Sequence, residues 1–207
     1  MVMMVSAALA GAKLAGFSIK LQPGQGLWNT YEISREGTTQ IASVRTSRDR
    51  YISFPPLDQG RRWETLDDAD VVLVSAVDDH LNPQNIDVYL FPADEVRKRF
   101  DANYAARIAN ARPVPDNHGL WVPIDKGDDA VIDHVGHSLA IDYPAIARFA
   151  IDELEAVGNI EPETKHLAVG VPSFKTASDV LVFARAQIAA ITGMPIERLK
   201  LDLRLDV

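Results

Sequence analysis

The sequence contains no cysteine. This excludes disulfide bonds, thiolate zinc sites and a cysteine nucleophile, and it leaves the redox compartment undetermined. No stretch reads G-x-x-x-x-G-K-[ST] or G-x-S-x-G. A P-loop and the nucleophile elbow of an α/β-hydrolase are therefore excluded as well. Internal repeats and low-complexity tracts are also absent.

The sequence also lacks an apolar run long enough to span a membrane. The opening "MVMMVSAALAGAKLAGF" is rich in small apolar residues, but no Lys or Arg precedes it and Lys13 interrupts it, unlike a signal peptide. The run is shorter than the ~18 residues that a membrane span needs. We therefore expect the first helix of a cytoplasmic domain and no membrane partner.

Positive charge is scarce, with 21 Lys and Arg against 29 Asp and Glu and a net charge of −8. This balance does not favour nucleic acid as a partner. Residues 1–112 contain 13 basic and 14 acidic residues, whereas residues 113–207 contain 8 and 15. The acidity lies mostly in the second half, so the first half could still present a local basic face.

The 207 residues suffice for one large domain or two small ones. Hydrophobic residues make up 47% and charged residues 24%, as in an ordinary soluble globular protein. We expect an α/β domain over residues 1–125 and an acidic C-terminal α/β element over residues 126–207. The second element would pack on the first, on a second copy or on a partner chain.

Periodicity predicts the elements of the first domain. A helix over 2–15 ends at Gly16, and a second helix over 93–111 is indicated by Val96, Phe100 and Tyr104, spaced by four. The expected strands are 17–21, 28–34, 38–47, 50–55, 70–78, 85–92 and 119–124. "REG" between the second and third of these signals a hairpin. The continuous apolar run at 70–78 indicates a central strand buried on both faces.

Polar and mixed segments complete the prediction. A surface loop with one buried aromatic residue, Trp63, is expected at 58–69, and a loop at 22–26. The second half should contain a long connection at 125–144, helices at 144–158 and 176–192, and strands at 166–171 and 198–207. The fold class is α/β or α+β, with a mixed sheet flanked by helices and a small C-terminal strand–helix–strand element.

Four short motifs carry a family resemblance. They are "AKLAGFSI", "TYEIS", "IASVRTS" and "VYLFPADEV", in that order along the chain. In this order they resemble a bacterial member of the PD-(D/E)XK nuclease-like superfamily over about residues 5–110. "IASVRTS" lies where that superfamily often has "IQVKTS".

The resemblance assigns three positions to a catalytic centre. In members of this superfamily, an Asp and a Glu or Gln on adjacent strands hold a divalent metal ion. A Lys that lies two residues after the Glu or Gln activates the attacking water. The corresponding residues here are Glu32, Ser43 and Arg45. Serine is a weak neutral ligand for a hard ion such as Mg²⁺, and arginine stays protonated and cannot be a general base. The resemblance therefore implies a degenerate site without a cofactor. Mg²⁺ would bind only in a relaxed site that combines Glu32 with other carboxylates.

Five arginines lie close together in the sequence, with Tyr51 among them and Trp63 directly after them. They are Arg45, Arg48, Arg50, Arg61 and Arg62. Gathered on one side of the domain, they would bind phosphate groups of nucleic acid, because the guanidinium fork donates two parallel hydrogen bonds. In the other interpretation, neighbouring Asp and Glu side chains neutralise the patch, and Glu32 and Arg45 form a cross-strand pair.

A weak metal motif lies in the second half. "DHVGH" contains Asp133, His134 and His137, whose side chains suit zinc or iron. An H-x-x-H pair outside a helix has no fixed geometry, so the motif alone does not predict a metal centre.

These observations lead to one leading hypothesis and two alternatives. The leading one is a catalytically inactive nuclease-like module that binds nucleic acid or a protein partner. The first alternative is a metal-dependent nuclease with a relaxed active site. The second is an oligomeric protein-interaction scaffold whose working surface is the acidic second half.

Overall fold

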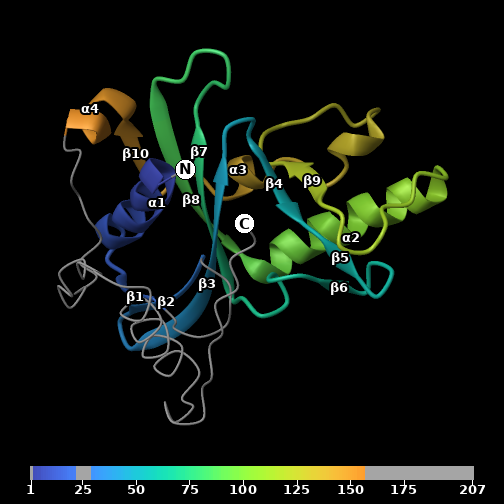
Figure 1. The fold of residues 1–207 in the computed structure, drawn as a ribbon, viewed down its shortest axis with the longest axis horizontal. Coiled ribbons are helices and arrows are strands. Elements are labelled where there is room, and N and C mark those ends of the chain that lie inside the picture. The colour runs from blue at the N-terminus through green and yellow to red at the C-terminus, as the bar shows by residue number, and fades with distance from the viewer. Residues whose placement is uncertain (1, 22–28, 157–207) are drawn as a thin grey trace, which may run out of the picture. The chain divides into compact units, whose positions relative to one another are not determined.

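The computed structural model describes residues 2–21 and 29–156, and its fold is mixed α+β (Figure 1). Its centre is a six-stranded mixed sheet with the spatial order β1-β2-β3-β7-β8-β10. These strands are β1 (Ser18–Leu21), β2 (Thr30–Arg35), β3 (Thr38–Ser47), β7 (Val71–Val77), β8 (Asn85–Pro92) and β10 (Ala147–Ala150). The loop predicted at 22–26 and the elements predicted beyond residue 158 lie outside the described residues.

Strands β1, β2 and β3 form an antiparallel meander. The turn between β2 and β3 contains Glu36 and Gly37, with φ of 53° and 82°. Two consecutive positive φ values are typical of the tight hairpin turn whose twist matches that of the strands. The hairpin predicted from "REG" is therefore confirmed.

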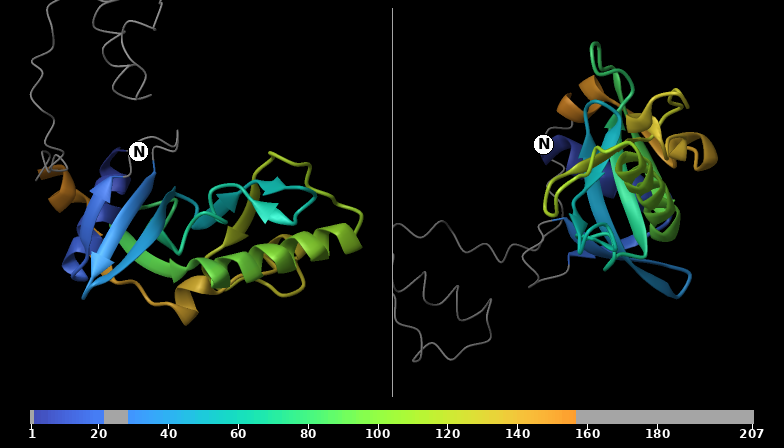
Figure 2. Two further views of the ribbon diagram at one scale, coloured as in Figure 1. Left: turned by 90° about the horizontal axis from the view of Figure 1, so that it is seen from below. Right: turned by 90° about the vertical axis from the view of Figure 1, so that its right-hand side faces the viewer.

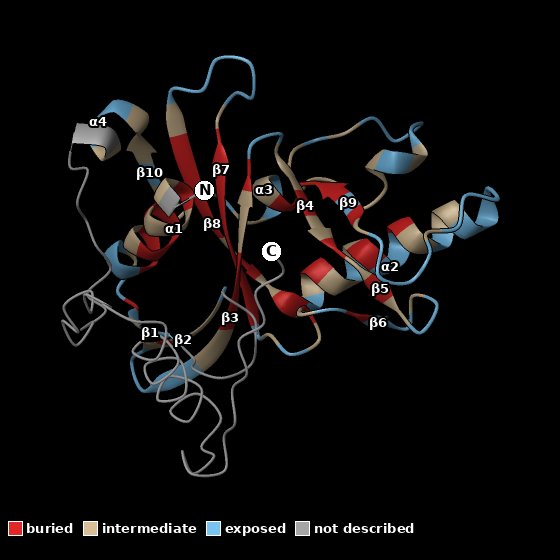
Figure 3. Ribbon diagram, in the orientation of Figure 1, coloured by how far each residue is buried: buried red, intermediate tan, exposed pale blue. Residues whose placement is uncertain are grey.

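Two helices cover opposite faces of this sheet, α1 (Val2–Leu14) and α2 (Ala93–Ala109) (Figure 2, right). Every residue of β7 is buried, as predicted, because β7 pairs in parallel with β3, antiparallel with β8 and lies under both helices (Figure 3). Small residues let α1 approach closely, and a Cβ on Gly11 would lie 2.8 Å from the side chain of Val88. Phe100 of α2 belongs to the core on the other face.

Smaller sheets lie beside the main one. Strands β4 (Tyr51–Phe54) and β9 (Leu120–Pro123) pair antiparallel, and β5 (Pro56–Leu57) and β6 (Arg62–Trp63) form a short hairpin. The predicted strands at 50–55 and 119–124 are thus confirmed, and they pair with each other. Trp63 is 1% exposed, as expected, and its ring packs edge-on against Phe100.

The helix predicted at 144–158 is wrong in its first half. Residues 147–150 form β10, and only α4 (Ile151–Ala156) is helical. Backbone bonds to the open edge of β8, including Ile146 N to Val88 O at 2.7 Å, outweigh local helix propensity. Phe149, which lies on β10, packs against the core cluster that includes residues of α1. Because β10 completes the main sheet, residues on both sides of position 125 share one sheet.

The connection predicted at 125–144 contains two short elements, a 3₁₀ helix η1 (Ile132–His134) and α3 (Leu139–Asp142). Leu139 is fully buried and belongs to the core that also contains Phe100. Within residues 2–21 and 29–156, no helix is long and apolar enough to cross a membrane.

Candidate nucleic-acid interface

The structure places the three positions assigned by the family resemblance on one face of the sheet. Thr30 pairs with Ser43 and Glu32 with Ile41, and directly paired residues of an antiparallel ladder share a face. Arg45 lies two residues beyond Ser43 and therefore on the same side. This is the face away from α1, which packs against the intervening residue Val44.

The chemistry of these positions differs from that of a metal centre. Ser43 is 1% exposed, and its hydroxyl has no hydrogen-bond partner among the described residues. The guanidinium of Arg45 lies 4.4 Å from the ring centre of Phe54 and donates to Val44 O and to Thr65 Oγ1. Burial lowers the pKa of Arg45 to about 10, against the opposing charge of Glu64. The described residues contain no Glu32–Arg45 ion pair.

No group of three His, Asp or Glu side chains in the described ranges could hold a metal ion. The weak candidates of "DHVGH" have separate partners. Asp133 pairs with Arg107 of α2 at 3.1 Å, and His137 Nε2 contacts Asp129 Oδ1 at 2.8 Å. His134 Nδ1 accepts a hydrogen bond from the Asp128 backbone N–H at 3.0 Å. Asp133, His134 and His137 thus have separate partners and form no such group among the described residues.

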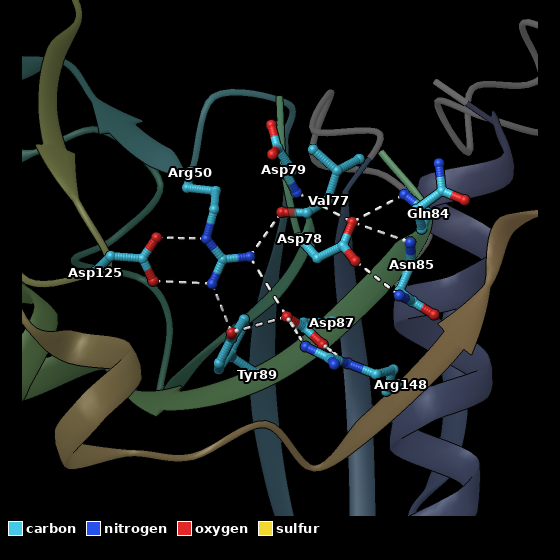
Figure 4. Close-up of polar contacts among 10 residues, drawn as sticks. All are labelled: Arg50, Val77, Asp78, Asp79, Gln84, Asn85, Asp87, Tyr89, Asp125 and Arg148. Atoms are coloured by element: carbon cyan, nitrogen blue, oxygen red, sulfur yellow. Dashed lines mark hydrogen bonds and ion pairs between the residues drawn. The ribbon is translucent and has the colours of Figure 1, made fainter. Parts of the chain in front are cut away.

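Arg50 is partly buried, and its five N–H donors are all occupied (Figure 4). Nε and Nη2 donate to the two carboxylate oxygens of Asp125, and Nη2 also donates to the Tyr89 hydroxyl at 2.7 Å. Nη1 donates to Val77 O at 2.6 Å and contacts Asp87 at 3.4 Å. No N–H of Arg50 remains for a phosphate group, since arginine has only five donors.

Asp87 links Arg50 to a second arginine. This carboxylate is 3% exposed and accepts two bonds from Arg148 of β10, at 2.6 and 3.0 Å. Together, Arg50, Asp87, Tyr89, Asp125 and Arg148 form what we call the Arg50 network (Figure 4). Its two guanidinium groups balance its two carboxylates, which is how buried charges are normally accommodated. The network therefore joins the start of β4 to β8, β10 and the end of β9.

Charge and burial act in opposite directions inside the network. Burial disfavours the charged form of Arg50, but hydrogen bonds to Asp125 and Tyr89 outweigh this effect and raise its pKa. Burial raises the pKa of Tyr89, while its hydrogen bond to Arg50 opposes that rise. Both groups therefore keep their usual protonation states near neutral pH.

The remaining arginines of the predicted patch are exposed. Arg48 has no hydrogen-bond or ion-pair partner among the described residues. Arg61 Nε donates to Asp58 O at 3.0 Å, and among the described residues Arg62 makes two 3.9 Å ion pairs, with Asp58 and Asp67. In Figure 1 the turn between β3 and β4 and the hairpin of β5 and β6 lie at opposite ends of β4. Arg45 and Arg50 are thus partly buried, and the other three arginines occupy two separate surface positions.

A further ordered segment was not predicted from the sequence. Asp78, after β7, accepts hydrogen bonds from the Asn85 backbone N–H and side-chain amide and from Gln84 N, at 3.0, 2.7 and 3.0 Å (Figure 4). These bonds, led by that of the Asn85 backbone, hold the pKa of Asp78 well below its usual range. The Asp and Asn residues of "DDHLNPQN" are the signal that could have indicated this turn.

One member of the Arg50 network, Asp87, could have been identified from the sequence. Asp87 interrupts the otherwise apolar run "NIDVYLFP", and a charged residue in a buried strand normally has a charged partner.

Comparisons of the whole chain with protein-family models, with curated proteins and with solved structures found no match.

Proposed function

We propose that this chain is a nuclease-like domain that lacks metal chemistry and binds nucleic acid. One observation carries the loss of metal chemistry: Glu32, Ser43 and Arg45 share a sheet face, but Ser43 offers only a buried neutral hydroxyl and Arg45 a protonated guanidinium. With a pKa near 10, Arg45 remains protonated near neutral pH. No group of three candidate ligands occurs within residues 2–21 and 29–156.

Exposed arginines favour nucleic acid as the ligand. Arg48 at one end of β4 and Arg61 and Arg62 at the other leave guanidinium donors in contact with solvent. A guanidinium can donate two parallel hydrogen bonds to one phosphate group, as it does to a carboxylate. The net charge of −8 opposes this attraction over the whole molecule. We therefore expect weak binding that depends steeply on salt.

The test is a fluorescence anisotropy titration of labelled single- and double-stranded DNA and RNA. It is run at about 50 and 200 mM salt, with and without Mg²⁺, because phosphate contacts release counterions. The same samples are then separated on a denaturing gel. We expect saturable, salt-sensitive binding and intact oligonucleotides.

A matched set of variants sharpens the test. Replacing Arg48, Arg61 and Arg62 together by Ala should weaken binding and flatten its salt dependence, by roughly 0.7–0.9 in slope for each lost phosphate contact. Lys13→Ala serves as the control, since Lys13 is an exposed cation at the end of α1. Mg²⁺-dependent cleavage that Glu32→Ala abolishes would replace the proposal by the nuclease alternative. Absence of binding together with a concentration-dependent mass would favour the scaffold.

A further inference from the structure

Three polar side chains near α3 form a continuous chain of hydrogen bonds. His137 Nε2 contacts Asp129 Oδ1 at 2.8 Å, and His137 Nδ1 contacts the Ser138 hydroxyl. We call Asp129, His137 and Ser138 the serine cluster. A hydroxyl, an imidazole and a carboxylate in this order are the groups that activate a serine nucleophile, and such a set is recognised by geometry and roles rather than by sequence position.

The two partners of His137 decide which ring nitrogen carries the proton. An ionised carboxylate only accepts hydrogen bonds, so the contact with Asp129 requires Nε2 to be the donor. In a neutral imidazole the other nitrogen is then unprotonated, and Nδ1 accepts the hydrogen bond of the Ser138 hydroxyl. The serine cluster therefore places a base on the hydroxyl proton, with a carboxylate that orients the base.

The backbone around His137 is fixed by α2. Arg99 Nη1 donates to His137 O at 2.9 Å, and the amide of fully buried Asn103 donates to Val135 O at 2.7 Å. A Cβ on Gly136 would lie 2.5 Å from Arg99 O, so the chain passes close to α2 at this point. The arrangement of the cluster thus depends on contacts made outside it.

The imidazole ring is enclosed more than its carboxylate partner. The His137 side chain is 17% exposed, and a Cβ on Gly127 would lie 3.1 Å from its Cδ2 atom. The Asp129 side chain is 93% exposed, so water competes for its carboxylate. We therefore expect Asp129 to orient the ring less firmly than a buried aspartate would.

Ser138 occupies a strained turn. Its φ and ψ of 77° and 14° lie in the left-handed region, which disfavours residues with a Cβ. Its N–H donates to Asp125 O at 2.8 Å, and its carbonyl accepts bonds from the N–H groups of Ile141 and Asp142, both at 3.1 Å. Strained residues gather at functional sites, and the serine nucleophile of α/β-hydrolases also lies on a strained turn before a helix. Ser138 is partly exposed, so a small substrate can reach it.

We propose that Ser138 is a nucleophile for acyl transfer from small carboxylic esters, with His137 as the general base. Ser138 Oγ bonds to the carbonyl carbon while its proton moves to His137 Nδ1. The bond from that carbon to the alcohol oxygen breaks, and the alcohol leaves with the proton. Water then bonds to the acyl carbon and gives a proton to Nδ1. The bond to Oγ breaks, the acid leaves, and Oγ takes the proton back.

The first test is covalent labelling of the full chain with an alkyl fluorophosphonate. An activated serine bonds to its phosphorus, and the phosphorus–fluorine bond breaks with loss of fluoride and of the hydroxyl proton. Intact mass spectrometry should show one phosphonyl group per chain, and peptide mapping should place it on Ser138. Ser138→Gly should stay unlabelled. Glycine is chosen because it removes the hydroxyl and accepts the positive φ, so this variant should fold.

The second test is kcat/KM for p-nitrophenyl acetate, whose good leaving group suits an open site. Ser138→Gly and His137→Gln should each lower it by roughly 10²-fold or more, the range in which a positioned acid or base acts. Asp129→Asn should lower it less, because the exposed carboxylate contributes only orientation. His80→Gln and His118→Gln are the controls. Both histidines are exposed and lie outside the cluster, so the rate should not change.

The outcomes distinguish catalysis from a purely structural role of the same contacts. If the cluster only ties the chain together, His137→Gln lowers the Tm, but the wild type neither takes up the label nor exceeds Ser138→Gly in hydrolysis; that result would overturn the proposal. Equal rates for the wild type and His137→Gln would overturn it as well. Labelling of Ser138 that is lost in a folded His137→Gln variant would support it. The proposal does not depend on nucleic-acid binding.

Discussion

The Arg50 network allows a quantitative prediction about stability. Arg50→Ala removes a guanidinium with five hydrogen bonds and leaves Val77 O and the Tyr89 hydroxyl without their donor. Removing one partner of a buried ion pair costs about 3–5 kcal/mol. The cost should lie at the low end, because the Asp125 side chain is 45% exposed and water can solvate it, while Asp87 keeps Arg148. We expect a loss of about 3 kcal/mol in the free energy of unfolding.

The backbone conformation at Arg50 allows a second prediction about stability. Its φ of +62° lies in the left-handed region, which costs a residue with a Cβ roughly 1–2 kcal/mol relative to glycine. Arg50→Gly loses the same hydrogen bonds but relieves this strain. It should therefore be about 1 kcal/mol more stable than Arg50→Ala.

Urea denaturation followed by circular dichroism measures both differences. The control is Arg48→Ala, two residues away and exposed, which should change stability by less than about 0.5 kcal/mol. In a thermal scan, a loss of about 3 kcal/mol corresponds to a decrease in Tm of roughly 6–12 °C for a chain of this size. If Arg50→Ala and Arg48→Ala unfold at the same urea concentration, the structural role assigned to Arg50 is refuted.

Three further predictions concern single positions. Although the Arg148 side chain is 60% exposed, Arg148→Ala should cost about 2 kcal/mol, because it removes the two shortest bonds of buried Asp87. In a double-mutant cycle measured in urea, adding Asp87→Asn should cost less in that background than in the wild type. Asp78 has a lowered pKa in the folded state, so its contribution is present above about pH 4 and is lost as pH falls further. Stability measured from about pH 5 down to pH 2 should therefore decline less in Asp78→Ala than in the wild type; equal slopes would contradict this assignment. Gly60→Ala should cost more than Gly37→Ala in thermal unfolding, since both have positive φ but only Gly60 has an aromatic ring in the position of the new Cβ.

Local patterns predicted much of this fold. Helix α1, the buried strand β7 and the hairpin at Gly37 each depend on residues within a short window, so sequence periodicity and turn chemistry identified them. Strand β10 was missed because its conformation is set by the free edge of β8, about 60 residues earlier in the chain. Local helix propensity contains no information about such a partner.

The same reasoning explains what the sequence predicted about the site. "IASVRTSRDR" indicated a strand followed by arginines, but it could not show that Arg50 faces Asp125, a residue 75 positions away. Close spacing in the sequence suggested a single basic patch, whereas β4 separates Arg48 from Arg61 and Arg62. "GLWVPI" predicted a strand, and the side on which Trp121 lies was decided only by its pairing with β4.

Binding of nucleic acid without cleavage is the central claim, and one titration tests it most directly. Labelled oligo(dT) is mixed with the full chain at about 50 mM and 200 mM salt, with and without Mg²⁺, and then separated on a denaturing gel. We predict saturable binding that weakens at the higher salt, with an intact oligonucleotide under every condition. Mg²⁺-dependent cleavage, or no binding at the lower salt, would contradict the claim.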